Sequence, residues 1–221
     1  MSLADRLAEV DERIADAARQ AGRDPVELTR IVVTKFHPAS LVRELAALGV
    51  RDVGENRHQE AAAKAAELTD LELSWHFVGQ LQSNKARAVR RYASAVHSVD
   101  RPSLVGALAG EDTLDCFIEL NLTDDPARGG VASDAVEPLA ELVASTAGLR
   151  LRGVMAVAPL GADPRPAFAR VRETSHRVRA IVPDATAISA GMSEDFADAI
   201  AEGATHLRIG TAITGKRSTS G

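Results

Sequence analysis

The start of the chain has apolar residues every three to four positions, with polar and charged residues between them. This spacing places the apolar residues on one face and predicts an amphipathic helix at the N-terminus. These residues are Leu3, Leu7, Val10 and Ile14. Ser2 and Asp5 are spaced as in a capping box, which indicates where the helix begins, and Gly22 indicates where it ends.

Beyond Gly22 the pattern changes to a repeated alternation of short apolar runs, polar or glycine-containing turns, and Ala- and Leu-rich segments of helical periodicity. The expected strands span 30–34, 51–53, 75–79, 95–99, 115–120, 151–156, 186–189 and 206–209. The expected helices include 40–49, 58–68, 135–145 and 194–203. Helix start signals are present at Pro38, Asp100, Asp163 and Ser193.

About eight alternating strand and helix units imply either a closed parallel barrel or an open doubly wound sheet. In both folds, ligands bind at the carboxyl ends of the strands, because helix N-termini and loop backbone groups point there. A chain of 221 residues suits one well-buried core. We therefore expect a single domain spanning 1–221, with 215–221 as a frayed polar tail.

Composition and charge exclude several classes of partner and location. The net charge of −5 offers no general attraction to nucleic acid or anionic lipid. No segment approaches the ~18–20 apolar residues of a membrane span, and the acidic start lacks the basic-then-apolar order of a secretion signal. The single cysteine, Cys116, lies in an apolar run and is expected to be a buried structural thiol. We expect a cytoplasmic protein without nucleic-acid or membrane partners.

Lys35 follows the apolar run 31–34, which places its ammonium group at the carboxyl end of the first expected strand. Taken alone, it is typical of a solvated surface lysine. At a strand end, partial desolvation or a nearby cation favours the neutral amine of a lysine, and that amine can condense with an aldehyde. Lys35 is therefore a candidate for Schiff-base chemistry.

Two glycine-containing segments near the C-terminus indicate a phosphate site. Gly191, Met192 and Ser193 follow the seventh expected strand and open a helix, where backbone N–H groups and the Ser193 hydroxyl could hold a phosphate. The alternative is that Ser193 merely caps its helix. The last expected strand runs into Gly210, which permits close approach of a ligand, and Thr211, which adds a hydroxyl.

Arg208 shares its strand face with Gly210 and lies opposite Leu207 and Ile209, so its guanidinium group is expected to point into a barrel or its mouth. Against a pyridine nitrogen it would donate a hydrogen bond and disfavour protonation of the ring, which weakens the electron sink that pyridoxal enzymes use. The equally weighted alternative is a salt bridge to a carboxylate at a strand end.

The remaining polar residues near strand ends carry weaker signals. Asn56 follows the second expected strand and could donate to a ring substituent. His76 has no neighbour at metal-ligand spacing, which favours a hydrogen-bonded core histidine over a metal ligand. His58, His97 and His206 have no partner in the sequence, and we assign them no function.

Seven segments carry a specific resemblance along nearly the whole chain. They are VVTK at 32–35, VGENRHQE at 53–60, WHFVGQLQSNK at 75–85, HSVDR at 97–101, LRLRGVMAV at 149–157, GMSEDFADAI at 191–200 and LRIGTAITG at 207–215. In this order and spacing the sequence resembles the pyridoxal phosphate homeostasis protein family, whose fold is similar to the barrel domain of bacterial alanine racemase.

The resemblance implies an α/β fold, namely a single (β/α)8 TIM-type barrel with an extra N-terminal helix and no second, β-rich domain. It also implies pyridoxal 5′-phosphate (PLP) as the cofactor, held as a Schiff base on Lys35, with Arg208 near the pyridine nitrogen. The other residues that the resemblance places around PLP are Ser193, Gly210 and Thr211 at the phosphate, and Asn56 and Met155 in the pocket lining.

Three functions are compatible with this pattern. The favoured one is a monomeric PLP-binding protein in intracellular vitamin B6 homeostasis, which holds the cofactor on Lys35 and releases it to PLP-dependent apo-enzymes. The second is a PLP-dependent enzyme such as an amino-acid racemase, although the one tyrosine, Tyr92, falls in a helical pattern and no other second acid or base is evident. The third is a barrel scaffold in which Lys35 is incidental and which acts through a protein partner.

Overall fold

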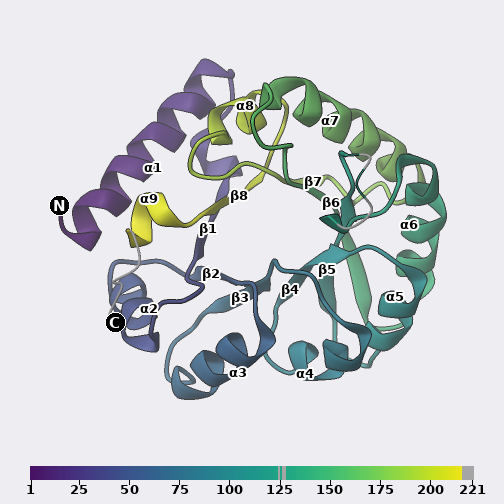
Figure 1. Cartoon of the computed structure of the whole chain (residues 1–221), viewed down its shortest axis with the longest axis horizontal. Coiled ribbons are helices and arrows are strands. Elements are labelled where there is room, and N and C mark those ends of the chain that lie inside the picture. Colours follow the sequence, from purple (N-terminus) through teal and green to yellow (C-terminus); the bar gives the residue numbers. More distant parts are fainter. Residues whose placement is uncertain (124, 126–127, 216–221) are drawn as a thin grey trace.

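The computed structural model describes residues 1–123, 125 and 128–215 of the chain. Within these residues, eight parallel strands form a closed barrel in sequence order, with the last strand paired to the first (Figure 1). The strands are β1 (Thr29–Val33), β2 (Asp52–Glu55), β3 (Ser74–Phe77), β4 (Ala95–Val99), β5 (Leu114–Leu120), β6 (Leu149–Ala156), β7 (Ala187–Ser189) and β8 (His206–Ile209). The predicted α/β class and TIM-type barrel are confirmed.

Helices surround the barrel as an outer layer (Figure 1). They are α1 (Leu3–Gln20), α2 (Ala39–Ala47), α3 (His58–Glu67), α4 (Ala86–Arg90), α5 (Pro102–Leu108), α6 (Val136–Ser145), α7 (Pro164–Ile181), α8 (Phe196–Ala201) and α9 (Thr211–Thr214). Short 3-10 segments are η1 (Pro25–Glu27), η2 (Ser83–Lys85) and η4 (Ser133–Ala135). Each helix from α2 to α8 follows one strand and returns the chain to the start of the next.

The N-terminal helix α1 completes this outer layer, because α9, the helix that follows β8, has only four residues. Helix α1 packs beside both α8 and α9 (Figure 1). Its buried face contains the apolar residues that predicted it, and the capping box between Ser2 and Asp5 is present. Arg6 Nε also donates to the Ile213 carbonyl oxygen at 2.6 Å, which ties α1 to the end of the barrel chain.

Side chains alternate between the barrel interior and the surrounding helices, as in any strand. On β8, Leu207 and Ile209 are fully buried in the apolar core that the strands share with the helices. His206 and Arg208 have the opposite orientation, and the His206 ring contacts Phe117 of β5 across the barrel. TIM-type barrels are filled mainly by branched apolar side chains. In this barrel, His206 and Arg208 bring polar groups into the interior.

Two predicted strands were wrong by two residues at their carboxyl ends. The second strand was expected at 51–53, but it is Asp52–Glu55, so Gly54 and Glu55 lie inside the strand and not after it. Parallel pairing with β3 at four positions holds these two residues extended. The third strand ends at Phe77 and not at 79, because the backbone of Gly79 packs directly against the backbone of Asn56.

The start of α8 also differs from the prediction. The helical pattern at 194–203 and the start signal at Ser193 predicted a helix that begins directly after Ser193, but α8 begins at Phe196. Residues 193–195 form a turn instead, in which the Met192 N–H donates to the Asp195 carboxylate at 2.6 Å. This contact between side chain and backbone overrides the local helical pattern.

Two further expectations concern membranes and the C-terminus. Across the described residues, every helix is too short or too polar to cross a lipid bilayer. The expected tail at 215–221 lies outside the described residues from 216 onward.

Candidate functional site

A cavity of about 340 Å³ opens at the carboxyl ends of the barrel strands. Six of the seven residues predicted to form the site line this cavity. They are Lys35, Asn56, Ser193, Arg208, Gly210 and Thr211. These residues come from the ends of β1, β2, β7 and β8, so barrel closure brings together segments that are up to 176 positions apart, from 35 to 211. The cavity lies on the face where parallel barrels bind their ligands.

Lys35 begins the loop after β1 and is exposed to solvent at the cavity. The preceding residue, Thr34, is fully buried and is held from two sides. Its hydroxyl donates to the Glu55 carboxylate at 2.6 Å, and its carbonyl oxygen accepts from Lys64 Nζ at 2.9 Å. Lys64 and Glu55 form a buried ion pair with an N–O distance of 2.5 Å. This network fixes the strand end from which Lys35 projects.

Phe36, directly after Lys35, has a left-handed backbone conformation with a φ of 67°. This conformation costs a non-glycine residue about 1–2 kcal/mol. The Phe36 N–H donates to Glu60 Oε2 at 3.0 Å, and its ring lies 4.9 Å from the guanidinium carbon of Arg57. Contacts from the first turn of α3 thus stabilise the sharp turn that presents Lys35 at the barrel mouth.

Asn56 lines the cavity and is half-buried, with its Oδ1 atom shielded from solvent. Its Oδ1 atom has no hydrogen-bond partner among the described residues. Buried polar atoms are nearly always hydrogen-bonded in native proteins, so an orphaned one at a cavity indicates a ligand or bound water. Gly79 determines the position of Asn56, because a Cβ at position 79 would overlap the Asn56 backbone.

The turn after β7 meets the start of α9 at one side of the cavity. The Ala212 N–H donates to Ser193 Oγ at 3.4 Å, which joins the two segments predicted to hold a phosphate. The alternative in which Ser193 caps its helix is wrong, because the N-cap of α8 is Asp195. A Cβ at Gly210 would meet Val33 at an ordinary 3.7 Å, so protein packing does not require glycine there, and its open side faces a ligand site.

Arg208 lies at the buried side of the cavity and is only 5% exposed. Its Nη1 donates to Ser189 Oγ at 2.7 Å, and its Nη2 donates to the Ala156 carbonyl oxygen at 2.8 Å. Burial lowers the pKa of Arg208 to about 10, while the nearby carboxylates of Glu119 and Asp195 act against this shift. The guanidinium group therefore stays charged at neutral pH. The alternative of a strand-end salt bridge is not found among the ion pairs of the described residues.

Comparisons with known proteins agree on the family to which this chain belongs. The model of the alanine racemase N-terminal domain matches residues 7–218. A pyridoxal phosphate homeostasis protein of Pseudomonas aeruginosa is 42% identical over 224 residues, which covers 98% of this chain and 96% of the relative. Its counterpart in Escherichia coli K12 is 35% identical, and that match covers 99% of this chain and 98% of the relative. This chain belongs to the pyridoxal phosphate homeostasis protein family.

A solved structure supports this family assignment. PipY of Synechococcus elongatus, solved with PLP bound, is 36% identical to this family member and superimposes with a TM-score of 0.85. The match covers 97% of this chain and all of the PipY chain. The likeness thus extends over the whole barrel and both sides of the cavity.

Met155 of this homeostasis-family protein, which was expected to line the pocket, is 1% exposed and is not among the residues at the cavity, so its place beside the cofactor stays a prediction. Its side chain fills the barrel interior with three neighbours. These are Ala95, Phe117 and Ala187. Tyr92 was expected in a helix, but it lies in the turn after α4, where its ring stacks on His58 and not at the cavity.

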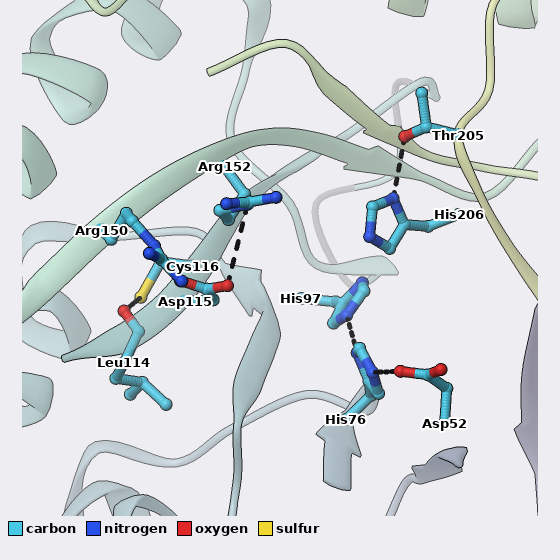
Figure 2. A network of polar contacts seen from close by, with 10 residues as sticks. All are labelled: Asp52, His76, His97, Leu114, Asp115, Cys116, Arg150, Arg152, Thr205 and His206. Carbon is cyan, nitrogen blue, oxygen red and sulfur yellow. Dashed lines mark hydrogen bonds and ion pairs between the residues drawn. The ribbon is translucent and has the colours of Figure 1, made fainter. Parts of the chain in front are cut away.

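The sequence patterns did not predict a series of hydrogen-bonded polar side chains inside the barrel of this family member. His76 Nδ1 lies 2.9 Å from His97 Nε2, and His76 Nε2 lies 2.9 Å from Asp52 Oδ1 (Figure 2). His97 Nδ1 lies 2.9 Å from Ser189 Oγ, the atom that also accepts from Arg208. The interpretation of His76 as a hydrogen-bonded core histidine is confirmed. Within the described ranges, no group of three or more His, Cys, Asp or Glu side chains is arranged to hold a metal ion.

Proposed function

We propose that this chain binds PLP in the cavity at the barrel mouth, holds it as a Schiff base on Lys35, and takes part in intracellular PLP homeostasis. The relatives support this proposal, since PipY was solved with PLP bound and the curated relatives are named for PLP homeostasis. The observation that carries it is the cavity itself, which combines the Lys35 amine with the Ser193 segment and the Arg208 guanidinium group.

The residues at the cavity fit the functional groups of PLP. The Lys35 amine can form an imine bond with an aldehyde, with release of water. The hydroxyls of Ser193 and Thr211 can donate to a phosphate, and Gly210 leaves open the space that a side chain would fill. A ligand would also provide a polar partner for the orphaned Oδ1 of Asn56. A volume of about 340 Å³ lies in the range of small-ligand sites.

Lysine is rare in this chain, which makes Lys35 a well-defined attachment point. The four lysines are Lys35, Lys64, Lys85 and Lys216. The Lys64 amine is buried in its ion pair with Glu55. Lys85 lines a separate cavity of about 250 Å³, and Lys216 lies outside the described residues. Lys35 is therefore the described lysine that a ligand in the mouth cavity can reach.

The environment of Arg208 favours a carrier over a dedicated metabolic enzyme. Bound PLP supplies an electron sink that is strongest when its ring nitrogen is protonated. A charged guanidinium group can only donate, so Arg208 favours the unprotonated nitrogen and weakens that sink. Along the cavity wall of the described residues there is also no tyrosine or histidine opposite Lys35, and of the two carboxylates there, Glu194 and Asp195, the second already accepts from the Met192 N–H. A weak racemase-like activity is the alternative.

We further propose that the chain acts as a monomer in the cytoplasm and passes PLP to apo-enzymes that depend on it. Large exposed apolar side chains in the described residues are few and are spread over several elements, which suits a monomer. The exposed position of Lys35 suits transfer, because an incoming amine can reach the imine bond from solvent. Direct transfer of PLP requires that this protein and the recipient enzymes are in the same compartment.

The attachment to Lys35 is tested by absorbance spectroscopy with added PLP, before and after borohydride reduction, followed by peptide mapping of the reduced adduct. We expect a visible absorbance band in the wild-type protein and in Lys85→Ala, and none in Lys35→Ala. The reduced label should map to Lys35. A label on Lys85 or Lys216, or a band that persists in Lys35→Ala, would overturn the proposal.

The carrier role needs a separate measurement. The loaded protein is mixed with a PLP-dependent apo-enzyme, and the recovery of that enzyme's activity is followed over time. We expect full recovery, whereas the borohydride-reduced protein should give none because its cofactor is permanently attached. If the loaded protein instead racemises alanine at least tenfold faster than an equal concentration of free PLP, the enzyme alternative is correct.

A further inference from the structure

A chain of hydrogen bonds crosses the barrel interior from the mouth cavity toward the opposite end of the strands. Asp52, at the start of β2, lines a second cavity of about 440 Å³ at the amino ends of β1 and β2, and its side chain is 32% exposed. From Asp52 the chain runs through His76, His97 and Ser189 to Arg208. All members except Asp52 are 7% exposed or less. One end of the chain thus meets solvent and the other meets the proposed PLP site.

When both histidine rings are neutral, the carboxylate end of this chain fixes the direction of every hydrogen bond in it. A guanidinium group can only donate and a carboxylate can only accept. Arg208 therefore donates to Ser189 Oγ at 2.7 Å, and the Ser189 hydroxyl donates to His97 Nδ1 at 2.9 Å. His97 Nε2–H then donates to His76 Nδ1, and His76 Nε2–H donates to Asp52, each at 2.9 Å. In this arrangement each neutral ring carries its proton on Nε2, and this pair of tautomers is what the relay requires.

The surroundings support this assignment. Burial lowers the pKa of His97 well below its ordinary value, and the positive charge of Arg208 acts in the same direction, so the His97 ring is neutral. The third interior histidine, His206, is joined to the Thr205 hydroxyl at 2.8 Å and not to the chain (Figure 2). Two further interior carboxylates lie nearby: Asp115 is paired with Arg150 at 2.5 Å and with Arg152 at 3.7 Å, and Glu119 has a buried Oε2 without a hydrogen-bond partner among the described residues. The hydrogen bonds of His76 lead to Asp52, which is therefore the acceptor at the end of the chain.

We propose that four residues form a positioning relay that holds Arg208 in one orientation toward the PLP ring. The relay consists of Asp52, His76, His97 and Ser189. This inference rests on the proposed function, which supplies the ring. Because the hydroxyl hydrogen of Ser189 is held by His97, its lone pairs always face the guanidinium group. With Ala156 as the second acceptor, the remaining N–H groups of Arg208 are left for the cavity.

The relay makes a measurable prediction for the protein without PLP. In ¹⁵N NMR spectra, the rings of His76 and His97 should both be Nε2–H tautomers at neutral pH. Asp52→Ala should release this preference, whereas Asp52→Asn should retain it because the amide oxygen still accepts from His76. A tautomer mixture, or an Nδ1–H ring, in the wild-type protein would overturn the relay without any need for a variant that folds.

Binding of PLP tests the coupling to Arg208. Ser189→Ala removes an acceptor of Arg208 and should weaken PLP affinity about tenfold, with a shift of the visible absorbance band. Asp52→Ala should weaken affinity about threefold and shift the band in the same direction, and Asp52→Asn should restore both. The matched control is His206→Gln, a change at a half-buried interior histidine outside the relay, which should leave affinity and band unchanged. Since Asp52 lies at the far end of the strands, its effect on PLP must pass through the barrel interior.

Two outcomes would reject the relay: a wild-type affinity and band in Asp52→Ala, or equally large changes in His206→Gln. Failure of the proposed function looks different, because the wild-type protein would then take up no PLP on Lys35 while the histidine tautomers could still be measured. Lys35→Ala should keep the Nε2–H tautomers in either case.

Discussion

The Lys64 ammonium group lies 2.5 Å from the Glu55 carboxylate, and both side chains are buried directly behind the strand end that carries Lys35. Lys64→Met would leave the carboxylate buried without its charge partner. Removal of one partner of a buried ion pair costs about 3–5 kcal/mol. We expect the free energy of unfolding, measured by urea titration, to fall by that amount.

An exposed ion pair provides the control for this prediction. Arg43 and Asp70 also lie 2.5 Å apart, but their side chains are 48% and 57% exposed. Arg43→Met should therefore change the free energy of unfolding by at most about 1 kcal/mol. The double variant Lys64→Met/Glu55→Leu should lose less stability than Lys64→Met, since it leaves no unpaired charge. Equal losses in Arg43→Met and Lys64→Met would contradict the role of burial.

The close packing of Gly79 on Asn56 gives a second prediction. A Cβ at position 79 would overlap the Asn56 backbone, so Gly79→Ala must displace Asn56 from the cavity wall. We expect a loss of PLP affinity of about tenfold or more, corresponding to one lost polar contact, measured by fluorescence titration. Gly106→Ala is the matched control, because a Cβ there has no neighbour within 4 Å. It should keep PLP affinity and add about 0.5–1 kcal/mol of stability within α5.

A substitution at Gly210 should weaken PLP binding without a loss of stability. A Cβ at this position would make only ordinary contacts with Val33, at 3.7 and 3.8 Å, so Gly210→Ala should leave the free energy of unfolding within about 0.5 kcal/mol of the wild-type value. The same methyl group would occupy space at the proposed phosphate site. PLP affinity should therefore fall by an order of magnitude or more. Unchanged affinity would show that PLP does not approach the backbone at Gly210.

The outline of the site could be predicted because it is built from strand ends. Lys35 follows a β-branched run, and the alternation of Leu207, Arg208 and Ile209 placed the guanidinium group on the inner face. A parallel barrel brings all strand ends of one kind to the same face, so local patterns were sufficient to group these residues. Local patterns failed where a single contact decides where a helix begins. The Asp195 carboxylate accepts from the Met192 N–H, and α8 therefore begins at Phe196 and not directly after Ser193.

The interior relay could not be predicted from local patterns. His76 and His97 are 21 positions apart, and His97 and Ser189 are 92 positions apart. Their contacts depend on the register between strands and on closure of the barrel, which no short segment encodes. Met155 illustrates the same limit, since its place near a strand end indicated the cavity while its depth in the closed barrel put it among interior side chains. A local pattern specifies the face of a side chain and not its height along the barrel axis.

The ionisation of Glu119 should make the free energy of unfolding depend on pH. Burial raises the pKa of Glu119 to about 7, the Asp100 carboxylate adds to this shift, and Arg208 acts against it. An unfolded chain has a glutamate pKa of about 4.3. Between these values the folded state binds the proton more tightly, so Glu119 contributes stability at low pH that is lost as pH rises toward 7. Glu119→Gln should remove this loss, which is at most about 4 kcal/mol, in urea titrations between pH 4 and 8.

His206 should give a dependence of the opposite sign. Burial lowers the pKa of His206 to about 4, and the positive charge of Arg152 acts in the same direction. Because an unfolded histidine has a pKa of about 6.5, the unfolded state binds the proton more tightly, and stability falls as pH decreases from about 6.5 to 4. His206→Gln should lessen this acid-induced loss, whereas Glu119→Gln should lessen the loss on the alkaline side. If both variants changed the pH profile in the same direction, burial of these two groups could not be its cause.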